Sequence, residues 1–293
     1  MIPTLKKISG IIFISGIICV LFLFSGAQAI EVVQVEPAKN RLIIAPGTSR
    51  SGTIQVYNLS KDPKKIKAYL EDWAYLAVSD GSKDFKPAGT TPLSAARWIS
   101  FVPSEFSVPA YGRQTVNYTV KVPADAKGGH YAVLFFQNYL QEPQKTAEGV
   151  NVNVAVRVAS LFYIEPKATI NRKVSIEGLK LERQGGKWNV GARFTNLGNV
   201  DINTEGTFFL IDQNGKVYAR GEFNDVYTFP GDSADLVAAW KSAIPDGTYD
   251  LVMTINIGKA LEDAGLGKAP ALTREVSVTI SDNGGTVKIG EAK

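Results

Sequence analysis

Apolar and polar residues alternate along most of this chain, most regularly between residues 149 and 166, GVNVNVAVRVASLFYIEP. Every second residue in the first half of this segment is a valine: Val150, Val152, Val154, Val156 and Val158. Because successive side chains of a β-strand point to opposite faces, the pattern predicts a strand with one apolar stripe. The stripe packs either against the protein's own core or against a partner, and the sequence leaves both interpretations open.

Further strands are predicted on both sides of this segment. Residues 51–60, 65–76 and 114–123 alternate at a period of two, and the continuous apolar run 129–140 is typical of a central strand covered on both faces. A second series begins after Pro166. It comprises residues 174–183, 187–196, 206–212, 216–223, 233–240, 247–258 and 272–280. Many short strands, frequent turn residues and no long segment of helical period indicate antiparallel sandwiches.

The sequence therefore predicts an all-β protein with two tandem immunoglobulin-like β-sandwich domains after a signal peptide. Pro166 cannot donate to a β-ladder, so we place the domain junction there, with one domain at residues 30–165 and the other at 166–282. Asn214-Gly215 predicts a hairpin with a type I′ turn. Residues 258–267 predict a single helical turn, and the polar residues 283–293 a mobile tail.

The first 29 residues have the three parts of a secretory signal peptide. Lys6 and Lys7 precede a long apolar run, and small residues at 27–29 offer a cleavage site. We therefore expect export to the periplasm or cell envelope, with no membrane span left after cleavage. A retained N-terminal anchor is the alternative.

The composition argues against several classes of function. The 32 basic and 28 acidic residues are interspersed, which predicts no nucleic-acid partner. The only histidine is His130, and the only cysteine, Cys19, lies in the signal segment, so no nucleophilic triad can be assembled. Asp201, Asn203, Glu205 and Asp212 resemble part of a calcium loop, but the residues between them predict a strand. We expect no enzyme activity, no cofactor and no metal.

Several segments of the first domain carry a family resemblance. These are IQVYN at 54–58, KIKAYLEDW at 65–73, VPSEFSVPAYGRQTVNYTV at 102–120, PADAKGGHYAVLFF at 123–136 and SLFYIEP at 160–166. Together they resemble the periplasmic pilus-assembly chaperones, the PapD-like family. Some of these segments are also similar to exported sandwich domains of Gram-positive surface complexes that bind cell-wall proteins.

The resemblance implies a mechanism of partner binding. In that family the last strand of the first domain lends alternating apolar side chains to an incomplete pilin sandwich, and two basic residues hold the C-terminal carboxylate of the pilin. The stripe from Val150 to Val158 takes the place of that strand, and Arg41 the place of the first basic residue. Ser160 stands where the family has the second, a lysine.

The resemblance thus implies a periplasmic chaperone that binds another exported β-rich or pilin-like protein by strand addition. An usher or a surface complex would be a further partner. The alternative is a structural or adhesive surface protein, in which the valine stripe belongs to the protein's own core and Arg41 is a solvated residue at a strand end.

Overall fold

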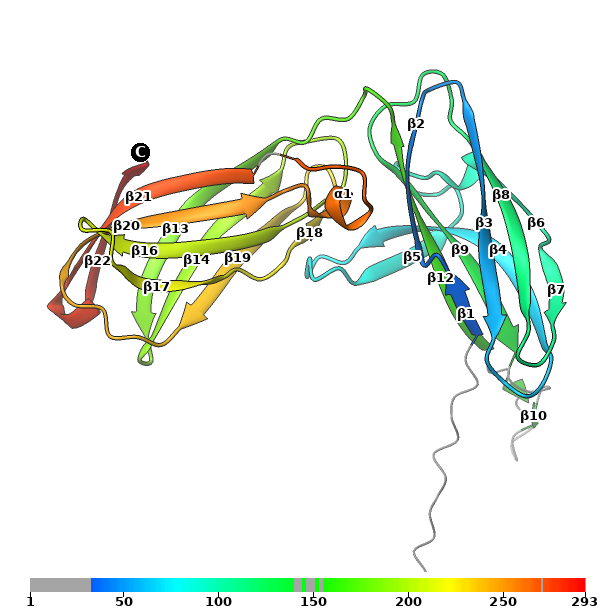
Figure 1. Ribbon diagram of the computed structural model, residues 1–293, viewed down its shortest axis with the longest axis horizontal. Coiled ribbons are helices and arrows are strands. Elements are labelled where there is room, and N and C mark those ends of the chain that lie inside the picture. Colours follow the sequence, from blue (N-terminus) through cyan, green and yellow to red (C-terminus); the bar gives the residue numbers. More distant parts are fainter. Residues whose placement is uncertain (1–32, 140–143, 146–150, 153–154, 270, 293) are drawn as a thin grey trace, which may run out of the picture. The chain divides into compact units, whose positions relative to one another are not determined.

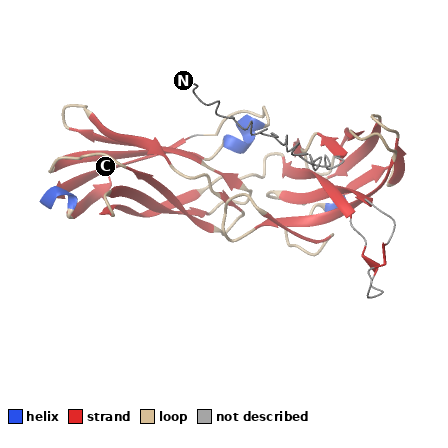
Figure 2. Cartoon of the chain, turned by 90° about the horizontal axis from the view of Figure 1, so that it is seen from below, coloured by secondary structure: helices blue, strands red, loops and turns tan. Residues whose placement is uncertain are grey.

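The computed structural model describes residues 33–139, 144–145, 151–152, 155–269 and 271–292. It is built almost entirely of β-strands, which form two consecutive sandwiches (Figure 2). We call residues 33–166 the first sandwich and residues 174–292 the second. Among the described residues, no helix combines the length and the apolar content needed to cross a membrane. The predicted signal peptide lies outside the described residues.

The first sandwich consists of two sheets (Figure 1). One has the strand order β1-β3-β8-β6, with β1 at Val33–Glu36, β3 at Ser49–Asn58, β8 at Arg113–Lys121 and β6 at Ile99–Val102. The other has the order β2-β12-β9-β4-β5, with β7 also paired to β4. Its strands are β2 at Lys39–Ile44, β12 at Ala155–Pro166, β9 at His130–Tyr139, β4 at Lys64–Tyr75, β5 at Lys83–Pro87 and β7 at Glu105–Val108. A short two-stranded pair, β10 at Gln144–Lys145 and β11 at Asn151–Val152, precedes β12.

Strand β9 is central and buried on both faces, as its apolar run predicted. Ala132, Leu134 and Phe136 belong to the core between the two sheets. The alternate residues Tyr131, Val133 and Phe135 join an outer cluster on the opposite face. That outer cluster comprises Trp73, Tyr131, Val133, Phe135, Leu161 and Tyr163.

The second sandwich also has two main sheets and one small one. The three-stranded sheet contains β13 at Val174–Gln184, β14 at Lys187–Asn196 and β19 at Ser233–Trp240. The five-stranded sheet has the order β17-β16-β20-β21-β22. Its strands are β17 at Val217–Glu222, β16 at Glu205–Asp212, β20 at Gly247–Asn256, β21 at Ala271–Ser281 and β22 at Thr286–Ala292. The strands β15 at Ile202–Asn203 and β18 at Tyr227–Thr228 form the small pair.

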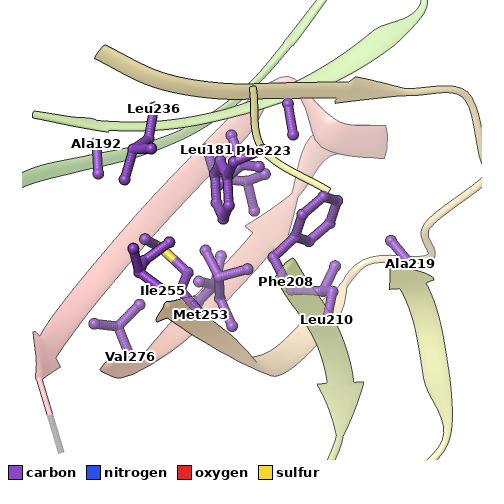
Figure 3. Packing of buried hydrophobic residues seen from close by; sticks show 14 of the residues in the cluster. Leu181, Ala192, Phe208, Leu210, Ala219, Phe223, Leu236, Met253, Ile255 and Val276 are labelled. Carbon is purple, nitrogen blue, oxygen red and sulfur yellow. The ribbon is translucent and has the colours of Figure 1, made fainter. Parts of the chain in front are cut away.

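The core of the second sandwich lies between its two main sheets. Phe208 and Leu210 of β16, Met253 and Ile255 of β20 and Leu236 of β19 all belong to this core (Figure 3). Their spacing of two residues is the alternation that predicted these strands, so the sequence pattern and the core agree.

Three local predictions can be compared with the structure. The helical turn forms as α1, Lys259–Asp263. The hairpin at Asn214-Gly215 joins β16 to β17, but its turn differs from the predicted type I′. Only Gly215 has a positive φ, +80°, and the Gly215 N–H bonds to the Asp212 carbonyl. A register shift follows in the pairing of β16 with β17, which is typical of a turn closed by a left-handed glycine and a bulge.

The C-terminal residues differ from the predicted mobile tail. Residues 286–292 form β22, which pairs antiparallel with β21. Val287 packs against the core of the second sandwich, and the Arg183 guanidinium donates to the Asn283 carbonyl at 2.6 Å. Pairing along the edge of β21 satisfies backbone groups, so a segment with few apolar residues is held as a strand.

Candidate functional site: an open strand edge beside a polar junction

Strand β12 has one edge that is only half covered. On one side it pairs with β9 from Ala155 to Ile164. On the other side it pairs with β2, in parallel, only from Leu161 to Pro166. Within the described residues, no strand pairs with the second edge of residues 155–160. Backbone N–H and C=O groups on such an edge are available to another strand.

The half-covered edge results from a change of sheet in the N-terminal strand. Residues of β1 pair with β3 in one sheet of the first sandwich, whereas β2 pairs with β12 in the other. The chain passes between the sheets at Pro37 and Ala38, and the Ala38 carbonyl accepts the Leu161 N–H at 2.9 Å. Because β1 belongs to the opposite sheet, it does not pair with the first half of β12, and the edge of residues 155–160 has no ladder partner among the residues that the structure describes.

The predicted valine stripe lies partly on this strand. Val156 and Val158 are both half-buried on β12, and Val158 packs against the core of the first sandwich. Val152 is in β11, paired with Gln144, and its side chain lies outside the described residues. Val150 and Val154 also lie outside them. The role of the stripe in partner binding stays a prediction.

Arg41 lies on β2 in a polar network that joins the two sandwiches. Its guanidinium binds Glu165 of β12 at 2.5 Å and forms two bonds to Asp201 of the second sandwich, at 3.0 and 2.6 Å. It also lies 4.4 Å from the centre of the Tyr163 ring. Only 6% of the Arg41 side chain is exposed, so its charge is compensated inside the protein. Its predicted role as a partner's carboxylate anchor stays a prediction.

The carboxylates around Arg41 have further partners. The Arg172 guanidinium donates to Glu165 at 2.6 Å. The Tyr131 hydroxyl donates to the Asp201 carboxylate at 3.1 Å and accepts the Asp201 backbone N–H at 2.6 Å. Burial alone would lower the pKa of Arg41, but its attraction to Asp201 and Glu165 raises this pKa above the ordinary value. The guanidinium therefore stays charged at every pH at which the protein is folded.

Aromatic rings complete the junction. Phe229 of the second sandwich stacks on Tyr131 at 4.4 Å and lies 5.3 Å from Trp73, between ring centres. The tip of the β4–β5 hairpin also contacts the second sandwich, because the Ser79 carbonyl accepts the Tyr227 N–H at 2.9 Å. Burial, followed by the nearby charge of Asp201, raises the pKa values of Tyr75 and Tyr163, so both phenols stay protonated.

A pocket of about 130 Å³ lies beside Arg41. Its walls include the cations Lys39 and Arg41, the carboxylates Asp201 and Asp263, and the side chains of Tyr75, Tyr163, Asn203 and Tyr227. The side-chain oxygen of Asn203 is buried and has no hydrogen-bond partner, which is rare for a buried polar atom. Lys39 is exposed, and within the described part of the chain it forms no ion pair. Its charge is close enough to contribute, after burial, to the lowered pKa of Lys83.

Lys39 was not singled out in the sequence. The available signal was its position two residues before Arg41, because residues i and i+2 of a strand share a face. Ser160, at the position of the expected second anchor, points the other way. It is fully buried, accepts a bond from the Asn40 side chain at 2.9 Å and donates to the Pro37 carbonyl at 2.7 Å. The cation that lines the pocket with Arg41 is therefore Lys39.

Other predicted candidates have structural roles. Asp201 belongs to the Arg41 network, and Asp212 accepts backbone N–H groups in the β16–β17 turn. The part of the chain that the structure describes holds no cluster of three histidine, cysteine or acidic residues able to bind a metal. His130, at the start of β9, packs against Trp98 with ring centres 4.1 Å apart and the rings tilted by 37°.

Comparisons with known proteins give matches only at the level of structure. No protein-family model matches the chain, and no curated protein matches its sequence. Among solved structures, the class 5 fimbrial chaperone CfaA is similar, with a TM-score of 0.46 and 16% identity over 83% of this chain and 98% of CfaA. The CupB2 chaperone of Pseudomonas aeruginosa is similar with a TM-score of 0.37 and 14% identity, covering 80% of this chain and 95% of CupB2.

A third similar structure is the E. coli chaperone DraB, with a TM-score of 0.35 and 12% identity over 76% of this chain and 92% of DraB. All three of these structures are named as chaperones, and each similarity has a TM-score below 0.5.

Proposed function

We propose that this protein is a chaperone-like binding protein of the periplasm or cell envelope that holds another exported β-rich or pilin-like protein by strand addition. The observation that carries the proposal is the open edge of β12 at residues 155–160. A guest strand placed there continues the sheet β2-β12-β9-β4-β5 and satisfies the free backbone groups of both chains. Main-chain hydrogen bonds of this kind supply affinity, and alternate side chains supply selectivity.

The half-buried valines suit such a guest. Val156 and Val158 lie on one face of the open strand, and each retains apolar surface that a guest side chain can cover. Burial of apolar surface contributes about 25 cal/mol per Å² to association before the entropic costs are subtracted. In this proposal the remaining valines of the predicted stripe, from Val150 to Val154, extend the same contact.

We further propose that the junction pocket takes the guest's terminal carboxylate. Lys39 supplies a cation that is not compensated by an ion pair among the described residues, and Arg41 lines the same pocket. A carboxylate beside Lys39 gains a charge-assisted hydrogen bond, which is roughly twice as strong as a neutral one. Arg41 already binds two internal carboxylates, so in this proposal its partner-binding role is to line the pocket beside Lys39.

A photo-crosslinking experiment tests the strand-addition site. A photoreactive phenylalanine analogue replaces Val156, and a matched control carries it at Val217, an exposed valine on the edge strand β17 of the second sandwich. We expect the Val156 position to capture a specific exported β-rich protein in the native host, identified by mass spectrometry. Equal capture from both positions, or none from Val156, contradicts the proposal.

The carboxylate site is tested separately by charge reversal. Lys39→Glu is expected to weaken capture by the Val156 probe about tenfold, because the acid repels the guest's terminus. Lys121→Glu, on the exposed face of β8, is the matched control. Arg41→Glu is less informative, because it disrupts the internal ion pairs with Glu165 and Asp201. Unchanged capture by Lys39→Glu removes the carboxylate site and leaves strand addition standing.

The second candidate function is a structural or adhesive surface protein. The contact of Val158 with the core of the first sandwich and the internal pairing of Arg41 favour it. It predicts that Val156→Asp, like Val158→Asp, unfolds the first sandwich. Strand addition predicts instead that Val156→Asp keeps the fold, as judged by circular dichroism, and loses capture of the guest.

A further inference from the structure

The outward face of the open strand carries a single arginine that reaches across the sheet. Arg157 is on β12 opposite Gln137 of β9. Its guanidinium lies 4.1 Å from the centre of the Phe135 ring on β9 and 5.3 Å from that of Phe85 on β5. It then reaches Glu71 of β4, with both carboxylate oxygens within 3.2 Å.

The groups beneath Arg157 are themselves fixed. Phe135 is buried and packs edge-on against Phe85 with ring centres 4.9 Å apart. The Tyr69 hydroxyl donates to the Gln137 side chain at 2.9 Å and lies 3.5 Å from the guanidinium. Arg157 therefore rests on a rigid aromatic platform, where stacking and ion pairing act together.

These contacts of Arg157 hold the part of β12 that has the fewest other restraints. Among the described residues, 155–160 pair with β9 alone, whereas residues 161–164 pair with β9 on one side and β2 on the other. A strand held along one edge frays more readily than one held along both. A fixed edge matters for strand addition, because a guest binds only to the fraction of molecules in which the edge is formed.

We propose that Arg157 is a positioning residue that clamps residues 155–160 of β12 in the extended conformation before a guest arrives. The proposal rests on the function proposed above and names a residue that makes that site competent. Arg157 faces away from the valine stripe, so it acts through the strand backbone and touches no guest side chain on the valine face.

Hydrogen exchange in the free, full-length protein tests the clamp directly. Arg157→Ala is expected to speed exchange of the β12 amides at 155–160 about tenfold, by lowering the fraction of formed edge. The matched control is Arg193→Ala, which removes an exposed arginine bound to Asp235 at 3.0 Å on the neighbouring strand β19. Unchanged exchange in Arg157→Ala overturns the proposal.

Binding gives the second readout. The probe is a short fluorescein-labelled peptide of alternating valine and serine with a free C-terminal carboxylate, titrated by fluorescence anisotropy. We expect Arg157→Ala to bind it about twofold more weakly, a smaller change than in exchange, because exchange follows the open fraction whereas the apparent dissociation constant scales inversely with the competent fraction. Arg157→Lys, which keeps the cation over Phe135, is expected to recover part of this loss, and Arg193→Ala to bind like the unsubstituted protein.

The outcomes separate the two proposals. If the unsubstituted protein binds the peptide and Arg157→Ala binds equally well, the positioning role is overturned and the proposed function stands. If neither the peptide nor a native guest binds the unsubstituted protein, the proposed function fails, while exchange at residues 155–160 still supports or overturns the clamp. Thermal unfolding is the last measurement. Arg157→Ala is expected to lower overall stability by less than about 1 kcal/mol, because an exposed ion pair contributes no more than that.

Discussion

Arg41 and Asp201 form a two-point ion pair, with nitrogen–oxygen distances of 3.0 and 2.6 Å, between strand β2 of the first sandwich and the segment that precedes β15 in the second. The two residues are 160 positions apart in the sequence. Both side chains are at least 94% buried, because their exposed fractions are 6% and 1%. Buried charges are tolerated only when they are paired and hydrogen-bonded, so this contact constrains both sandwiches.

Asp201→Ala is expected to lower the free energy of unfolding by about 3 kcal/mol, because it leaves part of the Arg41 charge buried without its partner. Urea unfolding followed by tryptophan fluorescence measures the change. Asp235→Ala is the control, since the exposed Arg193–Asp235 pair contributes less than about 1 kcal/mol. Equal losses in the free energy of unfolding would show that the Arg41–Asp201 pair contributes no more to stability than the exposed Arg193–Asp235 pair.

Ser160→Lys separates the family resemblance from the geometry of this chain. The resemblance places a lysine at this position, yet the Ser160 side chain is fully buried and bonded to Asn40 and Pro37. We expect Ser160→Lys to lower the free energy of unfolding by about 3 kcal/mol or more, because an ammonium enters an apolar core. Ser160→Ala is expected to cost about 1 kcal/mol. A stable Ser160→Lys protein with improved guest binding would contradict the buried, inward orientation of the side chain at position 160.

Asp72 organises the loop between β5 and η1, the short helical turn at Ala96–Trp98. Its buried carboxylate accepts bonds from the backbone of Thr90 and Thr91 and from the Ser94 hydroxyl. Asp72→Asn replaces one acceptor oxygen with a donor, and we expect a loss of about 2 kcal/mol in stability. Asp80→Asn is the matched control in an exposed turn, where Asp80 accepts the Ser82 N–H. Limited proteolysis of residues 88–95 provides an independent check. Cleavage should be faster in Asp72→Asn than in Asp80→Asn, because loss of the Asp72 hydrogen bonds lets this loop open.

The pH dependence of stability near neutrality should come from His130, the only histidine. Burial lowers its pKa below the ordinary value of 6.5. The unfolded chain therefore takes up the proton first as the pH falls, so stability is full above pH 6.5 and declines below it. His130→Gln should remove this part of the decline. Urea unfolding of both proteins between about pH 7.5 and pH 5 measures it, and parallel curves would contradict the assignment.

The sequence by itself determined the fold class and most of the strands. Alternation at a period of two reflects one buried face per strand, and the continuous apolar run at 129–140 reflects the two buried faces of β9, so both are local properties of the chain. Pro166, which has no backbone donor, is the last residue of β12. The last strand was missed because residues 286–292 are held by backbone pairing with β21, which leaves little trace in hydropathy.

The tertiary structure alone decided the chemistry of the site. Whether Arg41 was free or paired depended on Asp201, which no local pattern connects to it. Whether Ser160 faced the core or the junction depended on the register of β12 against β2 and β9. The open edge at residues 155–160 exists because β1 and β2 belong to different sheets, and the pairing of distant strands is a property of the whole chain.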